Sequence, residues 1–244
     1  MVVSKSIARY GAAKEAIVAM IRAGEIGGGM EQNKLPSEDE LSKMIGVSTG
    51  TVREALRILE MEGVVSKKHG AGNFFHPSTM DLKMRIDLMP DFKELLEDAG
   101  YGVRRDQRNF SFRPPSDRER EVFSLDGEVL SFDLTYVADG QNAINTVNIV
   151  PRQLLTAGLY EIKEDSTLME LLWRHCRERI SNSIEEIVPR LATEEEAEMY
   201  EITAGTPLIA LDEVFYSYKD TPIGYATVSF NPKIMKMHLL RKWS

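Results

Sequence analysis

Apolar residues recur with a helical period near the start of the chain. In "AKEAIVAMIRAG", Ile17, Met20 and Ile21 fall on one face of a helix that would end at Gly24. Two shorter helical patterns follow, separated by a three-residue turn. The first begins with a capping box, Ser37 and Glu40, and the second ends before Gly63.

A hairpin pattern completes this part of the chain. The segment "VVSKKHGAGNFF" predicts two short strands around a Lys-Lys-His-Gly turn. Three helices with a tight turn between the second and third, followed by a basic-tipped hairpin, indicate a winged helix-turn-helix domain over residues 1–76. Residues 77–89 show no clear period, and we interpret them as a linker.

Beyond residue 90 the pattern changes to short alternating segments. The predicted strands are "RNFSFR", "VLSFDLTYV", "INTVNIV", "SNSIEEIVPRLA", "PLIALDEVFYSY" and "IGYATVSF", and the predicted helices are "DFKELLEDAG", "STLMELLWRHCRER" and "TEEEAEMYEI". The turn signals "VADGQN" and "YKDTP" join strands as hairpins. Residues 90–244 are therefore expected to form an α+β domain with a largely antiparallel sheet.

Composition narrows the possible functions. No apolar run reaches the ~18 residues of a membrane span, and "MVVSKSIARY" lacks the apolar core of a signal peptide, so we expect a cytoplasmic protein with no membrane partner. The single cysteine, Cys176, excludes an internal disulfide framework and a cysteine-rich zinc site. We expect no cofactor and no metal.

The net charge of −8 is unevenly distributed. Residues 1–78 hold 10 Lys/Arg and 9 Asp/Glu, a balance of +1, so the remaining residues carry −9. A near-neutral first part still binds a polyanion when its positive groups share one face.

The start of the third helix has the chemistry of an anion site. Free backbone N–H groups and the positive end of the helix dipole attract a phosphate there. Ser48, Thr49 and Thr51 add hydroxyl groups, and Arg53 adds a guanidinium. Capping alone would also explain these hydroxyls, with Ser48 as the cap or with Thr51 and Glu54 as a second capping box. The helix-turn-helix spacing and the basic turn favour DNA binding.

The stretch "LPSEDELSKMIGVSTGTVREALRILEMEGVVSKKHGAGNFF" resembles the DNA-binding domain of the GntR family of bacterial transcription regulators. The resemblance implies a homodimer whose recognition helix and wing read a palindromic operator in double-stranded DNA. With the basic turn included, the expected DNA-binding residues are Ser37, Ser48, Thr49, Thr51, Arg53, Lys67, Lys68, His69 and Gly70. The family often has arginine at the positions of Asp39 and Thr49, which puts the usual operator sequence in doubt.

The second part resembles the UTRA effector-binding domain of the HutC-like subfamily, through "STLMELLWRH", "ISNSIEEIVPRLATEEEAEMYEITAGTPLIALDEVFYSYKDTPIGYATVSF". The resemblance implies a chorismate-lyase-like fold with a small-molecule pocket coupled to the DNA-binding heads. Many such domains hold an anion with an Arg-x-Arg pair, where this chain has Leu134 and Tyr136, and have a glutamate where it has Gly224. The expected effector is therefore not a phosphosugar. The expected lining is Phe132, Leu134, Tyr136, Asn148 and Tyr225.

These patterns favour a DNA-binding transcription regulator, a repressor in our interpretation, whose operator affinity depends on a small molecule. One alternative keeps the DNA binding but treats the pocket residues as sheet core, so that the second domain only dimerises. An enzyme fused to a DNA-binding domain is disfavoured because no paired catalytic residues stand out.

Overall fold

The computed structural model describes residues 2–27, 33–88, 91–125, 127–156 and 166–243. The chain divides into two compact units, Met1–Met89 with His238–Ser244, and Pro90–Met237. The tail that the sequence groups with the second domain is thus part of the first unit. The physical reason is that the tail bonds to this unit: the backbone N–H of His238 donates to Met84 O, and Lys242 Nζ donates to Met61 O.

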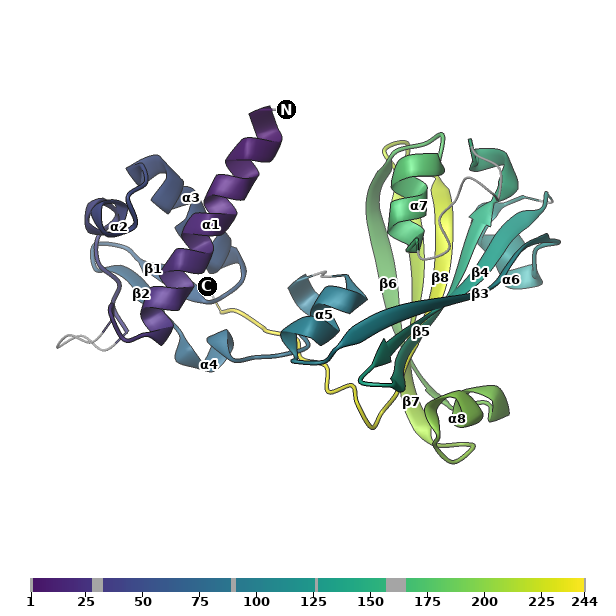
Figure 1. Cartoon of the computed structure of the whole chain (residues 1–244). Coiled ribbons are helices and arrows are strands. Elements are labelled where there is room, and N and C mark those ends of the chain that lie inside the picture. The colour runs from purple at the N-terminus through teal and green to yellow at the C-terminus, as the bar shows by residue number, and fades with distance from the viewer. Residues whose placement is uncertain (1, 28–32, 89–90, 126, 157–165, 244) are drawn as a thin grey trace. The chain divides into compact units, whose positions relative to one another are not determined.

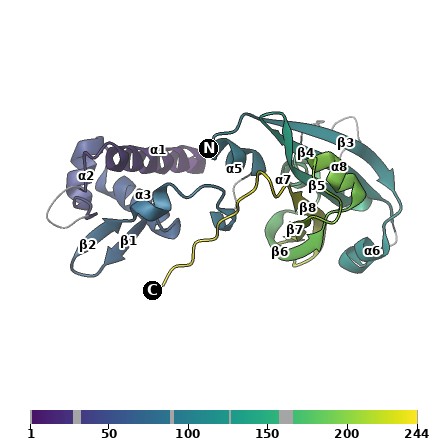
Figure 2. The same ribbon diagram turned by 90° about the horizontal axis from the view of Figure 1, so that it is seen from below.

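The first unit is a three-helix cluster with a two-stranded wing (Figure 1). It contains α1 (Val2–Arg22), α2 (Glu38–Ile45), α3 (Thr49–Met61), β1 (Val65–Lys68), β2 (Gly72–Phe75) and the short α4 (Pro77–Met80). Figure 2 shows α1 on one side of α3 and the β1–β2 hairpin on the other. Ile17, Leu41 and Leu59 are fully buried between the helices, so the apolar stripes of the sequence form one core.

Local caps fix the helix boundaries of this unit. The Ser37 hydroxyl accepts from the backbone N–H of Glu40, whose carboxylate accepts from the backbone N–H of Ser37 at 2.8 Å. This confirms the predicted capping box. Gly46 ends α2 in the left-handed region, with φ 74°, where glycine carries no steric cost.

The second unit contains one six-stranded sheet in the order β3-β4-β5-β8-β7-β6, and every pair of neighbouring strands in it is antiparallel. The strands are β3 (Val103–Arg113), β4 (Val129–Ala138), β5 (Gln141–Pro151), β6 (Ile180–Leu191), β7 (Pro207–Ser217) and β8 (Pro222–Phe230). The helices are α5 (Phe92–Asp98), α6 (Asp117–Phe123), α7 (Leu168–His175) and α8 (Glu194–Tyr200), with short 3-10 helices at Ile86–Leu88 in the first unit and Arg152–Leu154 in this one. The α+β expectation is confirmed, and α6 is a helix that the sequence patterns missed.

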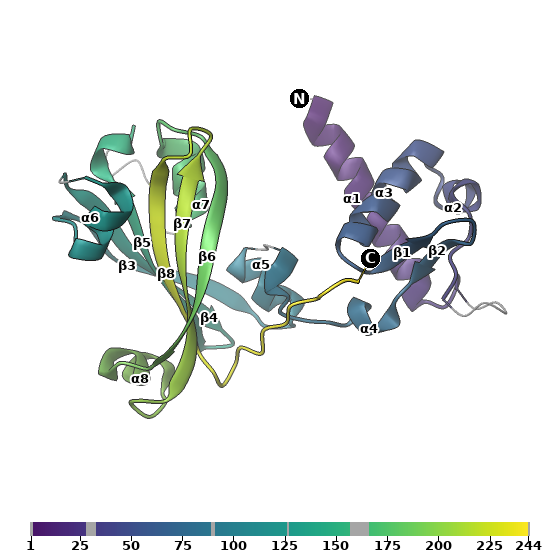
Figure 3. The same ribbon diagram turned by 180° about the vertical axis from the view of Figure 1, so that it is seen from behind.

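Helices cover both faces of this sheet. The face that we call the α7 face carries the cross-strand row Phe132, Asn148, Ala226, Glu213 and Glu185. Phe132 and Ala226 pack there with the leucines of α7, and the Phe92 ring of α5 stacks edge-on against Tyr136. The opposite face, the α6 face, packs against α6 and α8, which lie toward its two ends (Figure 3).

Among the described residues, none forms a helix that is long and apolar enough to cross a membrane.

Candidate DNA-binding surface and effector-binding domain

The N-terminal end of α3 gathers four of the predicted DNA-binding residues. Ser48 is the N-cap, and its hydroxyl accepts from the backbone N–H of Thr51 at 3.2 Å. The hydroxyls of Ser48 and Thr51 lie 2.9 Å apart, and the Thr49 hydroxyl donates to Asp39 at 3.2 Å. Ser48 therefore caps α3 and still leaves polar groups at the exposed end of the helix. The alternative capping box with Thr51 and Glu54 is not formed.

Arg53 lies one turn into α3 and points to solvent. Its side chain is 63% exposed, and its Nε and Nη2 both donate to Oε2 of Glu38, at 2.9 and 2.8 Å. This hydrogen bond and the charge of Glu38 raise the pKa of Arg53. The guanidinium is held in place by the half-buried Glu38 carboxylate, while the exposed guanidinium remains accessible to a DNA phosphate that competes for it.

The wing presents the other predicted contacts. Lys67, Lys68, His69 and Gly70 are all exposed at the junction of β1 and β2. Gly70 has φ 74°, a conformation that side chains rarely adopt, and the turn is closed by the bond from Ala71 N–H to Lys68 O at 3.0 Å. The glycine thus shapes the turn that carries the basic residues.

Ser37 is placed differently from these groups. Its hydroxyl donates to the Glu40 carboxylate at 2.7 Å within the capping box of α2. The side chain is exposed, but its hydrogen is engaged. A DNA phosphate, which only accepts hydrogen bonds, would have to displace the Glu40 carboxylate to bind this hydroxyl.

Four of the five expected effector residues lie on the α7 face. Phe132, Leu134 and Tyr136 alternate along β4, and Asn148 is the cross-strand partner of Phe132 on β5. All four are at most 3% exposed. The Asn148 amide donates to the Thr146 hydroxyl at 2.7 Å and to backbone carbonyls, so its polar group is satisfied within the sheet.

Tyr225 is the exception, because it lies on the α6 face. It is the cross-strand partner of Ile149 and packs with Phe123 of α6. The expectation of one pocket lined by all five residues is therefore corrected by the strand register. Residue parity along β8 decides the face, and sequence alone leaves the pairing of β8 with β5 open.

Arg105 is a basic group on the α7 face that sequence patterns missed. It is the cross-strand partner of Tyr136, and its Nη1 lies 3.6 Å from Glu170 of α7 and 4.0 Å from Asp91. Burial raises the pKa of Tyr136. Sequence analysis did not place Arg105 on the sheet because the predicted first strand began at Arg108, whereas β3 begins at Val103.

A carboxyl pair lies further along the same face. Glu213 and Glu185 are cross-strand partners on β7 and β6. Burial, with a smaller contribution from the charge of Glu185, raises the pKa of Glu213 to about 7, and a hydrogen bond from Ser183 opposes the shift. Glu213 is thus partly protonated at neutral pH.

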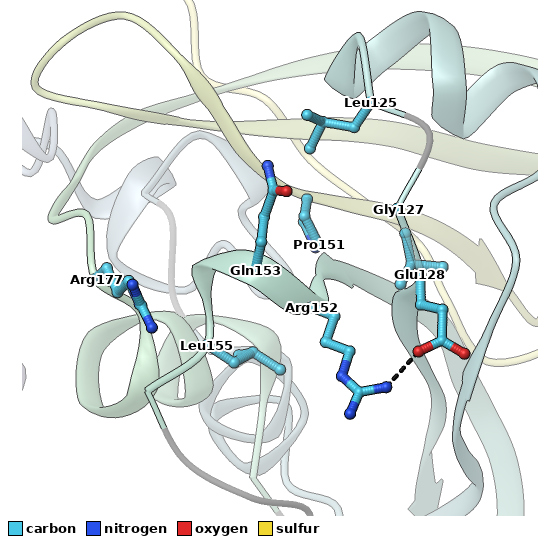
Figure 4. Close-up of a pocket in the computed structure, with 9 residues that line it drawn as sticks. Leu125, Gly127, Glu128, Pro151, Arg152, Gln153, Leu155 and Arg177 are labelled. Atoms are coloured by element: carbon cyan, nitrogen blue, oxygen red, sulfur yellow. Dashed lines mark hydrogen bonds and ion pairs between the residues drawn. The ribbon is translucent and has the colours of Figure 1, made fainter.

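A pocket of 370 Å³ lies at the start of β4 and the end of β5, and none of the five expected residues lines it (Figure 4). Arg152 pairs with Glu128 at its rim, and its guanidinium also lies over the Phe112 ring, 4.5 Å from the centroid. The lining residues are Leu125, Gly127, Glu128, Val129, Pro151, Arg152, Gln153, Leu155 and Arg177. Its size suits a small molecule, and its rim is mixed in charge.

Comparisons with known proteins agree with this architecture. Residues 9–75 match the model for bacterial regulatory proteins of the gntR family, and residues 98–236 match the UTRA domain. Among relatives, the HTH-type transcriptional regulator TreR of Bacillus subtilis is 27% identical over 69% of this chain and 71% of its own length. The HTH-type transcriptional repressor NagR of the same species is 25% identical over 87% of this chain and 86% of its own.

A solved structure shares the fold of the whole chain. The crystal structure of the possible transcriptional regulator YydK from Bacillus subtilis has a TM-score of 0.72 at 20% identity, covering 96% of this chain and 99% of that one. With a winged helix-turn-helix followed by a UTRA domain, this chain belongs to the GntR family of DNA-binding transcription regulators, with the HutC-like architecture.

Proposed function

We propose that the protein is a repressor that binds a palindromic operator as a homodimer and releases it when a small molecule occupies the UTRA domain. The observation that carries this proposal is the exposed polar end of α3, with Arg53 and the wing lysines, joined in one chain to a UTRA domain. The repressor role follows the name of NagR. We place the protein in the cytoplasm and assign it no catalytic step.

Exposed apolar residues on the sheet support dimerisation. Ile184, Ile187 and Leu191 of β6 are 54–63% exposed, and Ile209 of β7 is 41% exposed. β6 is an edge strand of the sheet. Ile187, Leu191 and Ile209 share the α7 face, whereas Ile184 lies on the α6 face. Exposed apolar groups gathered on one face beside an edge strand are typical of a protein interface.

The α7 face is our proposed effector site, with Phe132, Leu134, Tyr136 and Asn148 as its wall. The strand positions of Leu134 and Tyr136 offer no cation, and the nearby Arg105 is already flanked by Glu170 and Asp91. An anion placed there would lose hydration while facing two carboxylates, at a cost of several kcal/mol. The proposed effector is therefore neutral or mostly apolar, and not a phosphosugar.

A ligand screen by thermal shift tests effector binding. A neutral metabolite at ~100 times its Kd is expected to stabilise the fold by about 2.7 kcal/mol and to release operator DNA. Calorimetry with a hexosamine phosphate as the anionic probe is expected to show no tight binding. A micromolar phosphosugar complex would overturn the proposed ligand class, and a screen without any stabilising compound would favour a dimerisation domain without effector.

Two tyrosines provide a matched pair for locating the site. Tyr136→Ala removes a ring from the α7 face, and Tyr225→Ala removes one from the α6 face. We expect ligand-induced DNA release to weaken strongly in the first and to persist in the second. The reverse result would move the effector to the other face, and loss only in Arg177→Ala would move it to the pocket of Figure 4.

A further inference from the structure

The recognition helix α3 ends in acidic residues rather than in the basic residues that its dipole favours. Its last turn contains no Lys or Arg, and Glu60 and Glu62 flank its end. The last carbonyl groups of a helix have no helical donors and carry partial negative charge. The backbone N–H groups of Glu62, Gly63 and Val64 bond back to the carbonyls of Ile58, Glu60 and Leu59. The carbonyl groups of Met61 and Glu62 lie beyond these bonds and accept from donors in other parts of the chain.

Two distant segments supply these donors. Arg85, only 6% exposed, donates from Nη1 to the carbonyl oxygen of Glu62. Lys242 lies in the tail, and its Nζ donates to the carbonyl oxygens of Met61 at 2.7 Å and of Glu60 at 3.2 Å. The carbonyl groups of Glu60 and Met61, the last two residues of α3, and of the C-cap residue Glu62 are thus each bonded to a cation from outside the helix.

The tail docks along its length and not only through Lys242. His238 forms a parallel bridge with Arg85, and its N–H donates to Met84 O at 2.9 Å. Leu240 packs so closely over Gly63 that a Cβ at this glycine would lie 2.3 Å from Leu240 Cδ2. Gly63, two residues after the end of α3, thus has φ 72° and lies under an apolar side chain of the tail.

The other end of this segment is fixed in the UTRA unit. Asn231, directly after β8, is 2% exposed, and its backbone N–H donates to Ala143 O and its amide to Asn142 O, both at 2.8 Å. Met235 is 7% exposed. Only Lys236 and Met237 separate this anchor from the tail that begins at His238.

We infer that the tail His238–Trp243 is a positioning element of the recognition helix, tying the end of α3 to strand β8 through a short segment of chain. Lys242 and Leu240 act on DNA only through α3. This role rests on the proposed DNA-binding function of α3. The tail would give the UTRA domain a second connection along the chain to α3, in addition to the linker that precedes α5.

The test compares operator and scrambled duplexes, after an operator has been selected with the wild-type protein. The variants are Lys242→Ala, Leu240→Ala and a chain that stops after Met237. Arg241→Ala is the matched control, because Arg241 is an adjacent exposed cation whose ring contact is with Trp243. Lys242→Arg keeps donors for the two carbonyls and serves as the rescue.

We expect each point variant to reduce the ratio of operator to scrambled affinity about threefold to fivefold, and the shortened chain about tenfold or more. We expect binding to the scrambled duplex and its salt dependence to stay unchanged. A variant that had lost folded protein would bind both duplexes less, whereas a variant with a misplaced α3 would bind only the operator less. Arg241→Ala and Lys242→Arg are expected to match the wild type. If the shortened chain fails to fold, the point variants decide. Unchanged discrimination in them, or equal losses on both duplexes, would overturn the inference.

Discussion

At the N-terminal end of α3, each polar side chain has a short-range partner that DNA would compete with. Arg53 is held by Glu38 and Thr49 by Asp39. Both acceptors are carboxylates of α2, so the free protein carries negative charge close to the surface that meets phosphate. In the function that we propose, DNA binding exchanges the contact between Arg53 and Glu38 for a contact with a phosphate or a base, so we expect the side chains at these positions to affect affinity.

Arg53→Ala is expected to weaken operator binding by about 1–3 kcal/mol, because a bidentate guanidinium contact is lost. Arg57→Ala is the matched control: its side chain is also 63% exposed, and it lies one turn further from the helix start. Titration of a fluorescent operator at fixed salt measures both. Equal effects of the two substitutions would show that Arg53 contributes only general charge.

Lys67→Ala with Lys68→Ala is expected to weaken binding to all duplexes alike and to flatten the salt dependence. Each phosphate contact contributes a slope of ~0.9 in log K against log salt. Both lysines are exposed beside the wing turn. Binding measured across a salt series gives the slope. A double variant with the wild-type slope would show that the wing lysines do not contact the DNA backbone.

At the scale of elements, the α7 face combines apolar packing with ionisable groups. Gly224 of β8 lies beneath α7, where a Cβ would come within 2.9 Å of Leu172. A larger side chain at this position would have to displace Leu172, so the glycine lets α7 pack closely on β8. α7 therefore sits against the sheet beside the row of Phe132, Asn148 and Glu213, and any ligand on this face shares the space with the helix.

The positions of most strands and helices were predictable from the sequence, but the face of the sheet on which each side chain lies was not. Alternation in "VLSFDLTYV" and "PLIALDEVFYSY" located strands β4 and β7. Alternation does not say which strand pairs with which, so Tyr225 was placed on the wrong face. α6 was missed because its seven residues hold few apolar positions, although Ser116 and Glu119 form a capping box that signals its start.

Glu213 makes stability depend on pH. Its pKa is about 7 in the folded protein against an ordinary 4.5, so the folded state binds more protons between these values. Stability should then fall as pH rises from about 4.5 through 7, by on the order of 2 kcal/mol. Glu213→Gln should flatten this fall, whereas Glu186→Gln, exposed on the opposite face, should not. Urea unfolding at pH 5, 6, 7 and 8 measures the difference, and parallel curves for wild type and Glu213→Gln would refute it.

At the scale of the whole molecule, two chain segments run between the DNA-reading helix and the UTRA unit. One precedes α5, and the other is the segment from Asn231 to the tail. The sequence predicted the first as a linker from its lack of periodicity. Sequence analysis missed the second connection because the tail has no hydrophobic periodicity that would predict its position. Its contacts are with carbonyl groups of α3, some 180 residues away in sequence.

The whole molecule is expected to act as a homodimer, because one helix-turn-helix contacts too few base pairs for useful specificity. A two-fold axis relating two chains imposes the same symmetry on the DNA that they read. Ile187, Leu191 and Ile209, exposed together on the α7 face, offer a surface for such a pairing.

Selection of bound sequences from random duplexes tests the central claim most directly. We predict one enriched operator with two-fold symmetry and half-site centres about one helical turn apart. Arg53→Ala should lose this enrichment, and Arg57→Ala should retain it. Failure to enrich any sequence, or an enriched site without two-fold symmetry, would contradict a dimeric regulator that reads DNA with α3.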